Sequence, residues 1–105
     1  MKVNMTYSKD YLTKREAFKG FLVTMPVKLR NQWVEKLKTQ KQIYGSYFYI
    51  SHLNPTHGCC AVGALRLADD TYDYSLLFYV TTLNDTYKVT FKTFIKWICE
   101  SLPVK

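Results

Sequence analysis

The side chains best suited to chemistry form a histidine–cysteine cluster at His52, His57, Cys59 and Cys60. Imidazole and thiolate groups bind zinc, but zinc sites use spaced pairs of ligands, and adjacent cysteines seldom both reach one metal. A thiol at a helix N-terminus can instead act as a nucleophile with a nearby histidine as base, because the helix dipole lowers the thiol pKa. A third interpretation makes both cysteines small, buried packing residues.

The segment that follows the cluster favours the packing interpretation. From Gly58 to about Ala68 the side chains are mostly small and aliphatic, which suits a helix in close contact with a neighbour better than the wall of a polar cleft. We therefore expect Cys59 and Cys60 to be mainly buried, with at most one partly exposed, and we expect neither a bound metal nor a cofactor. The acids that come next are expected to form a solvated turn; they are Asp69, Asp70 and Asp73.

The net charge of +7 lies wholly in the first half of the 105-residue chain. Residues 1–50 hold ten Lys or Arg and three acids, whereas residues 51–105 hold five of each. The densest part is an amphipathic segment whose predicted basic face consists of Lys28, Arg30, Lys36, Lys38 and Lys41. Such a face suggests an acidic partner, either a nucleic acid or an acidic protein surface, and a solvated lysine surface is the simpler alternative.

Hydrophobic periodicity predicts the elements that must position these groups. Helices are expected from Ser8 to about Val23, from Pro26 (with Thr24 as N-cap) to Gln40–Gly45, from Gly58 to Ala68, and from Phe91 to Leu102 with Thr90 as N-cap. Residues Tyr47–Leu53 are typical of a strand, and Leu76–Leu83, which ends at Asn84-Asp85, suits either a strand or a helix. We predict an α-rich α+β fold: a compact single domain over residues 1–105, with four or five helices and a short strand or hairpin.

The sequence also indicates where the chain acts. No apolar run approaches the roughly 20 residues that a membrane-spanning helix needs, and the first residues lack the pattern of a signal peptide. The chain has three cysteines, of which two are adjacent and poorly placed to bridge each other, so reduced thiols are expected. We therefore expect a cytoplasmic protein with no membrane contact.

Several segments, taken in order, resemble those of small uncharacterised proteins of tailed bacteriophages. Those proteins carry a tryptophan helix, a Gly-x-Cys-Cys-Leu-Gly-Val-Leu-like segment, Leu-Asn-Asp and a terminal helix with Phe. The matching segments here are Trp33–Leu37, Gly58–Leu65, Leu83–Asp85 and Phe91–Leu102. Ala61-Val62 interrupts the usual Cys-Cys-Leu-Gly run, and residues 1–25 have no counterpart. The resemblance implies a virus-encoded accessory protein in the cytoplasm of a bacterial host, favours a helix for Leu76–Leu83, and carries over no catalytic residue.

From these features we expect a non-catalytic protein that binds a host macromolecule, as an inhibitor of a defence or metabolic complex would. The chain has nine Tyr, six Phe and two Trp, and such aromatic residues often anchor interfaces of about 800 Å² per partner. The partner would be a host protein or a protein–nucleic-acid complex. Two alternatives are a nucleic-acid-binding protein that uses the basic N-terminal half and a hydrolase that uses Cys59 or Cys60.

Overall fold

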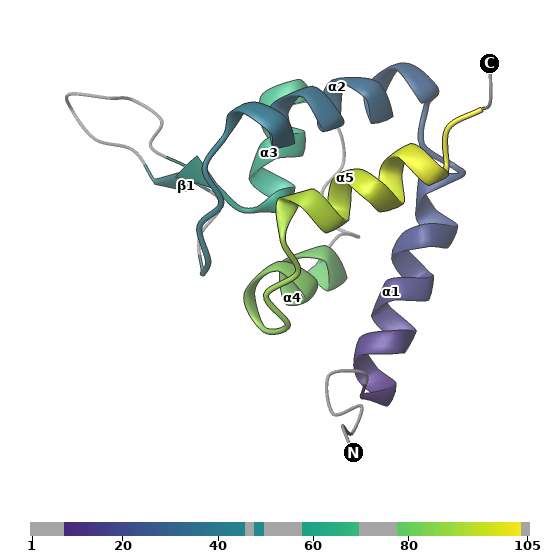
Figure 1. The fold of residues 1–105 in the computed structure, drawn as a ribbon, viewed down its shortest axis with the longest axis vertical. Helices are drawn as coiled ribbons and strands as arrows, with labels where there is room; N and C mark the ends of the chain where they lie inside the picture. The colour runs from purple at the N-terminus through teal and green to yellow at the C-terminus, as the bar shows by residue number, and fades with distance from the viewer. Residues whose placement is uncertain (1–7, 46–47, 50–57, 70–77, 104–105) are drawn as a thin grey trace.

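The computed structural model describes residues 8–45, 48–49, 58–69 and 78–103, which form five helices and two short strands (Figure 1). They are α1 (Lys9–Leu22), α2 (Val27–Thr39), β1 (Phe48–Tyr49), β2 (Gly58–Cys59), α3 (Ala61–Ala68), α4 (Phe78–Asp85) and α5 (Phe91–Glu100). The α-rich character and the predicted number of helices are confirmed, whereas the α+β class stays a prediction because each strand has only two residues. In this part of the chain no helix is both long and apolar enough to cross a membrane.

The helices meet in one apolar core that is centred on Trp33 of α2. Its indole ring is fully buried and packs edge to face on Phe18 of α1, with 5.8 Å between the ring centroids. Phe18 makes the same kind of contact with Phe94 of α5 at 5.5 Å. The indole nitrogen of Trp33 donates a hydrogen bond of 2.9 Å to the Ala61 carbonyl at the start of α3. One aromatic cluster therefore holds four elements together.

Helices α2 and α5 form an antiparallel pair, and Figure 1 shows α5 running below α2 in the opposite direction. Arg30, near the start of α2, donates to Ser101 just after α5. At the opposite end, Gln42 follows α2 and accepts a hydrogen bond from the amide of Phe91, the first residue of α5. The pair thus has two ends, and each end is closed by side-chain hydrogen bonds.

Of the two predicted N-caps, Thr90 is confirmed and Thr24 is not, and Ser8, for which no cap was predicted, caps α1. The Ser8 hydroxyl accepts a bond from the Tyr11 amide at 3.1 Å, and the Thr90 hydroxyl accepts one from the Thr93 amide at 3.2 Å. Thr24 does not cap α2, and that prediction is wrong. Its hydroxyl donates to the Phe21 carbonyl at 2.7 Å and so closes the end of α1, while Pro26 takes the N-cap position of α2.

The prediction that Gly58 opens a helix is also wrong, because Gly58 and Cys59 form strand β2. The Cys59 amide donates to the Lys41 carbonyl at 2.9 Å, and the Cys59 carbonyl accepts from the Ile43 amide at 3.0 Å. These bonds hold the backbone extended, so α3 begins only at Ala61. A Cβ atom on Gly58 would lie 2.6 Å from the Lys41 carbonyl oxygen, so this close approach needs glycine.

Two further predictions fall partly on residues outside the described ranges. Within the predicted strand Tyr47–Leu53, Phe48 and Tyr49 form β1, which pairs antiparallel with β2. The segment that could have been a strand or a helix, Leu76–Leu83, is helical from Phe78 onward, as the resemblance favoured. Helix α4 ends with Asn84 and Asp85.

Candidate functional site

The two adjacent thiols are enclosed in the core, as packing residues would be. Cys59 and Cys60 are 0% and 1% exposed. Burial raises the pKa of Cys59 to about 12, with a further contribution from Cys60. Burial also raises the pKa of the Cys60 thiol, although its sulfur caps α3 and accepts from the Gly63 amide at 3.5 Å. The prediction of burial is confirmed, and both thiols are held in the protonated form that is a poor nucleophile.

The two histidines of the predicted cluster cannot be compared with the thiols in this way. His52 and His57 lie outside the described residues, as do Asp70 and Asp73 of the acidic turn. Asp69 is half-buried and caps the C-terminus of α3. Across the described ranges, no group of three histidine, cysteine or acidic residues could hold a metal ion.

The predicted basic face of α2 is less concentrated than its sequence suggests. Lys28, Lys38 and Lys41 are exposed and Lys36 is half-buried. Glu35 lies among them and pairs with Lys38 at 3.7 Å. At 100° per residue, Lys28, Lys36 and Lys38 spread over roughly half of the helix circumference and do not form one stripe. The helix surface by itself therefore offers separate charges and no compact cationic site.

Arg30 does not belong to that exposed face, which corrects its predicted role there. Its side chain is 5% exposed, and its Nη1 donates to the Ser101 carbonyl at 2.7 Å and to the Ser101 hydroxyl at 3.0 Å. The guanidinium therefore ties α2 to the C-terminal end of α5, where the helix dipole favours a cation. The spacing contained this information, since Arg30 lies three residues before Trp33 and seven before Leu37 on the apolar stripe.

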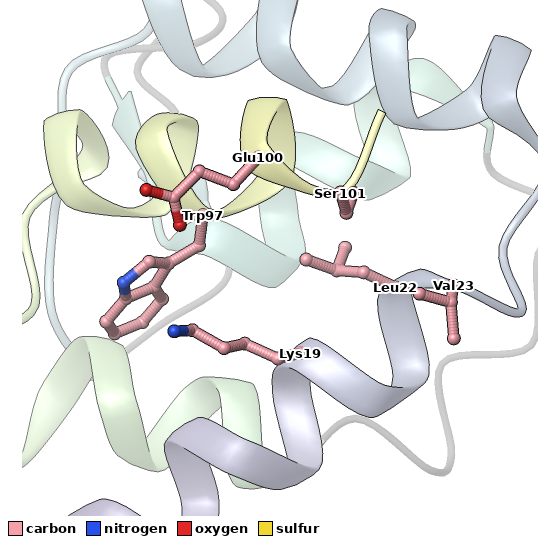
Figure 2. Close-up of a pocket in the computed structure, with 6 residues that line it drawn as sticks. All are labelled: Lys19, Leu22, Val23, Trp97, Glu100 and Ser101. Carbon is pink, nitrogen blue, oxygen red and sulfur yellow. The ribbon is translucent and has the colours of Figure 1, made fainter. Parts of the chain in front are cut away.

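A hollow of about 210 Å³ lies between α1 and the C-terminal half of α5. Figure 2 shows Lys19 of α1 reaching toward Trp97 of α5, with Leu22 and Val23 at the other end of the hollow. The Lys19 ammonium is 6.0 Å from the centroid of the Trp97 ring. Leu22 is buried at the base, whereas Val23 is 68% exposed at the rim.

Among the polar side chains around this hollow, Glu100 and Ser101 have partners, whereas Lys19 has no ion pair with a described residue. Glu100 pairs with Lys96 at 3.3 Å, and the Ser101 hydroxyl donates to the Ile98 carbonyl at 2.6 Å while it accepts from Arg30. Lys19 makes no ion pair with any described residue. The hollow thus combines an apolar lining with one uncompensated positive charge.

A second, mainly apolar hollow of about 190 Å³ lies between the start of α2 and the residues that follow Ser101. It is lined by Val27, Asn31, Leu102 and Pro103, and Val27 is 41% exposed. We call the lining of the two hollows the corner surface. Its residues are Lys19, Leu22, Val23, Val27, Asn31, Trp97, Glu100, Ser101, Leu102 and Pro103.

At the opposite end of the α2–α5 pair, sequence analysis missed a hydrogen-bonded clamp built by Gln42 and Asn84. Asn84 is fully buried; its Oδ1 accepts from Gln42 at 2.8 Å and from the Ala61 amide at 3.2 Å, and its Nδ2 donates to the Ile43 carbonyl at 3.0 Å. Gln42 also donates to the Val89 carbonyl at 2.7 Å. The only sequence signal was an asparagine beside apolar residues in α4, which also fits a helix end.

Comparison of the chain with protein-family models, with curated proteins and with solved structures gives no match. Its function must therefore be inferred from the chemistry of its own surfaces.

Proposed function

We propose that this chain is a non-catalytic binding protein of bacteriophage origin that engages a host protein in the bacterial cytoplasm through the corner surface. The observation that carries the proposal is the hollow between α1 and α5, where an apolar lining meets the uncompensated charge of Lys19. Val23 extends this apolar surface into solvent. Exposed apolar groups gathered around a hollow are typical of protein-binding surfaces.

The charge and shape of the hollow indicate the chemistry of the partner. An apolar side chain would fill the space above Leu22 and Trp97, and a carboxylate beside it would pair with Lys19. The surface that lines one hollow is much smaller than the roughly 800 Å² that each partner buries in a stable interface. The neighbouring residues of the partner segment would therefore occupy the second hollow, at Val27 and Pro103. The partner is therefore a protein segment with an apolar anchor next to an acidic residue.

The corner surface is also held in shape before a partner arrives. Arg30 holds Ser101, which lines the first hollow, through two hydrogen bonds. Because these groups need little further ordering, binding loses less conformational entropy than it would at a loose surface. This rigidity supports a role in occlusion of a partner surface.

The hydrolase alternative has less support. A thiol nucleophile needs exposure and a lowered pKa, and Cys59 and Cys60 have neither. On the corner surface Glu100 pairs with Lys96, and the Ser101 hydroxyl bonds to Ile98 and Arg30, so these described groups do not form a nucleophile with a free base.

The test compares glutamate substitutions on and off the corner surface. Lys19→Glu and Val23→Glu should each abolish recovery of the same partner from bacterial cells that express the tagged chain. Ala17→Glu, on an exposed part of α1, is the matched control and should retain that partner. Circular dichroism must show that all three variants fold. Recovery of the partner by both corner variants, or its loss in the Ala17 variant, would show that the corner surface is not the binding site.

A further inference from the structure

The other end of the α2–α5 pair carries exposed cations from two separate segments. The chain after α2, residues 41–44, runs beside the chain before α5, residues 88–91, because Gln42 bonds to both Val89 and Phe91. Lys41 therefore lies next to the clamp on the first segment and Lys88 lies on the second. Lys92 follows the second segment, in the first turn of α5. All three lysines are exposed, and none makes an ion pair with a described residue.

An exposed aromatic ring lies within this group. Tyr44 is 45% exposed, and the Lys88 ammonium lies 4.2 Å from the centroid of its ring. A cation at this distance holds the ring by a cation–π contact. The ammonium covers one face of the ring, so a planar group would stack on the other face. We call Lys41, Tyr44, Lys88 and Lys92 the basic end.

The backbone at Lys88 adds an independent observation. Its φ is +54°, a left-handed conformation that a residue with a Cβ atom adopts at a steric cost and that glycine adopts freely. The turn between α4 and α5 would therefore form more easily with glycine. The lysine side chain contributes something that the turn itself does not need, and unfavourable backbone conformations of this kind gather at functional sites.

We propose that the basic end binds single-stranded nucleic acid, with a base stacked against Tyr44 and phosphates held by Lys41, Lys88 and Lys92. A single strand offers both groups at once, namely unpaired bases for the ring and phosphates for the ammonium groups. A duplex keeps its bases stacked inside, and an acidic protein face offers carboxylates to the ammonium groups but no array of unpaired bases to the ring. This site is separate from the corner surface, so either proposal can fail without the other.

The test measures the binding of fluorescent oligo(dT) by anisotropy at several salt concentrations. Lys88→Gly should weaken binding severalfold, and it should leave the melting temperature unchanged or higher because it relieves the left-handed residue. Lys28→Gln removes the same charge from the other end of α2 and is the matched control, with little expected effect. Replacement of all three lysines of the basic end by Gln should reduce the salt slope by about 2, since each phosphate contact to a single strand contributes about 0.7.

The ring is tested separately from the charges. Tyr44→Leu should weaken oligo(dT) binding by roughly 5- to 100-fold, which is the range for one base stacked on an aromatic side chain, and Tyr44→Phe should restore it. The proposal is overturned if wild type fails to bind at low salt. It is equally overturned if Lys28→Gln weakens binding as much as Lys88→Gly, if Tyr44→Leu binds normally, or if duplex DNA or polyglutamate binds as tightly through the same residues.

Discussion

The two ends of the α2–α5 pair are built in different ways. The corner end is fixed by one buried cation, Arg30, and its surface is apolar and hollowed. The other end is fixed by neutral amide side chains, Gln42 and Asn84, and its exposed groups are cations around Tyr44. The buried cation Arg30 thus lies at one end, whereas the exposed cations around Tyr44 lie at the other. The comparison teaches that net charge alone does not locate a binding surface.

Both ends depend on the same core, and disruption of that core should affect them equally. Trp33→Ala removes a fully buried indole ring and its bond to the Ala61 carbonyl. We expect the free energy of unfolding to fall by about 3–5 kcal/mol, measured by urea denaturation. Binding at both ends should weaken in proportion to the unfolded fraction. A variant of unchanged stability would show that α2 does not pack through this face.

The hydrogen bonds of the clamp at the basic end can be removed by replacing Asn84 with an apolar side chain of similar branched shape. Asn84→Leu leaves the Ala61 amide, the Ile43 carbonyl and the Gln42 amide without their partner. An unsatisfied buried polar group is costly, so we expect a loss of about 2–3 kcal/mol in the free energy of unfolding. Asn31→Leu is the control, because Asn31 is exposed and its side-chain amide donates to the Val27 carbonyl within the same helix; its effect should stay within about 0.5 kcal/mol. Equal effects of the two substitutions would contradict the structural role of the clamp.

The corner end is tested by removing its buried cation. Arg30→Met keeps an apolar stem but loses two charge-assisted bonds to Ser101, and we expect a loss of about 1.5–3 kcal/mol. Lys38→Met removes an exposed charge from the same helix and should change the stability by less than about 0.5 kcal/mol. If thermal melts give the two variants equal stability, Arg30 lies on the exposed face of α2 and does not tie this helix to α5.

The smallest expected effect is a local change in the rate at which the thiols are labelled. With iodoacetamide at neutral pH, the exposed Cys99 should react quickly, whereas Cys59 and Cys60 should react slowly because they are buried with raised pKa values. Since the clamp closes over the start of α3, Asn84→Leu should speed the labelling of Cys59 and Cys60 severalfold, as measured by mass spectrometry. Arg30→Met should speed it less. The reverse order would show that the thiols open toward the corner end.

Much of the helical architecture could be predicted from periodicity. The apolar stripes of α2 and α5 place Trp33, Leu37, Phe94 and Ile98 in the core, where the structure has them. The start of α3 could not be predicted, because local preference for a helix at Gly58 yields to hydrogen bonds with residues 41–43. Such pairing depends on segments that are far apart in the sequence, and no local pattern encodes it.

The candidate surfaces were harder to predict than the fold. Arg30 was counted among exposed cations by residue type, although its position on the apolar stripe indicated burial. The two segments that carry Lys41 and Tyr44 on one side and Lys88 on the other are joined by Gln42. The corner surface likewise combines the end of α1 with the end of α5. Each surface is a product of the topology, and neither is visible as a run of residues.

The most direct test of the difference between the two ends is site-specific photo-crosslinking in bacterial cells. A photoreactive phenylalanine analogue would replace Val23 at the corner surface, Tyr44 at the basic end, or the exposed Ala17 as control. We predict a protease-sensitive protein adduct from position 23 that Lys19→Glu abolishes. From position 44 we predict a nuclease-sensitive adduct that Lys88→Gly abolishes, and from position 17 we predict none. Adducts of one kind from both ends, or equal labelling from position 17, would contradict the assignment of a protein partner to one end and a nucleic acid to the other.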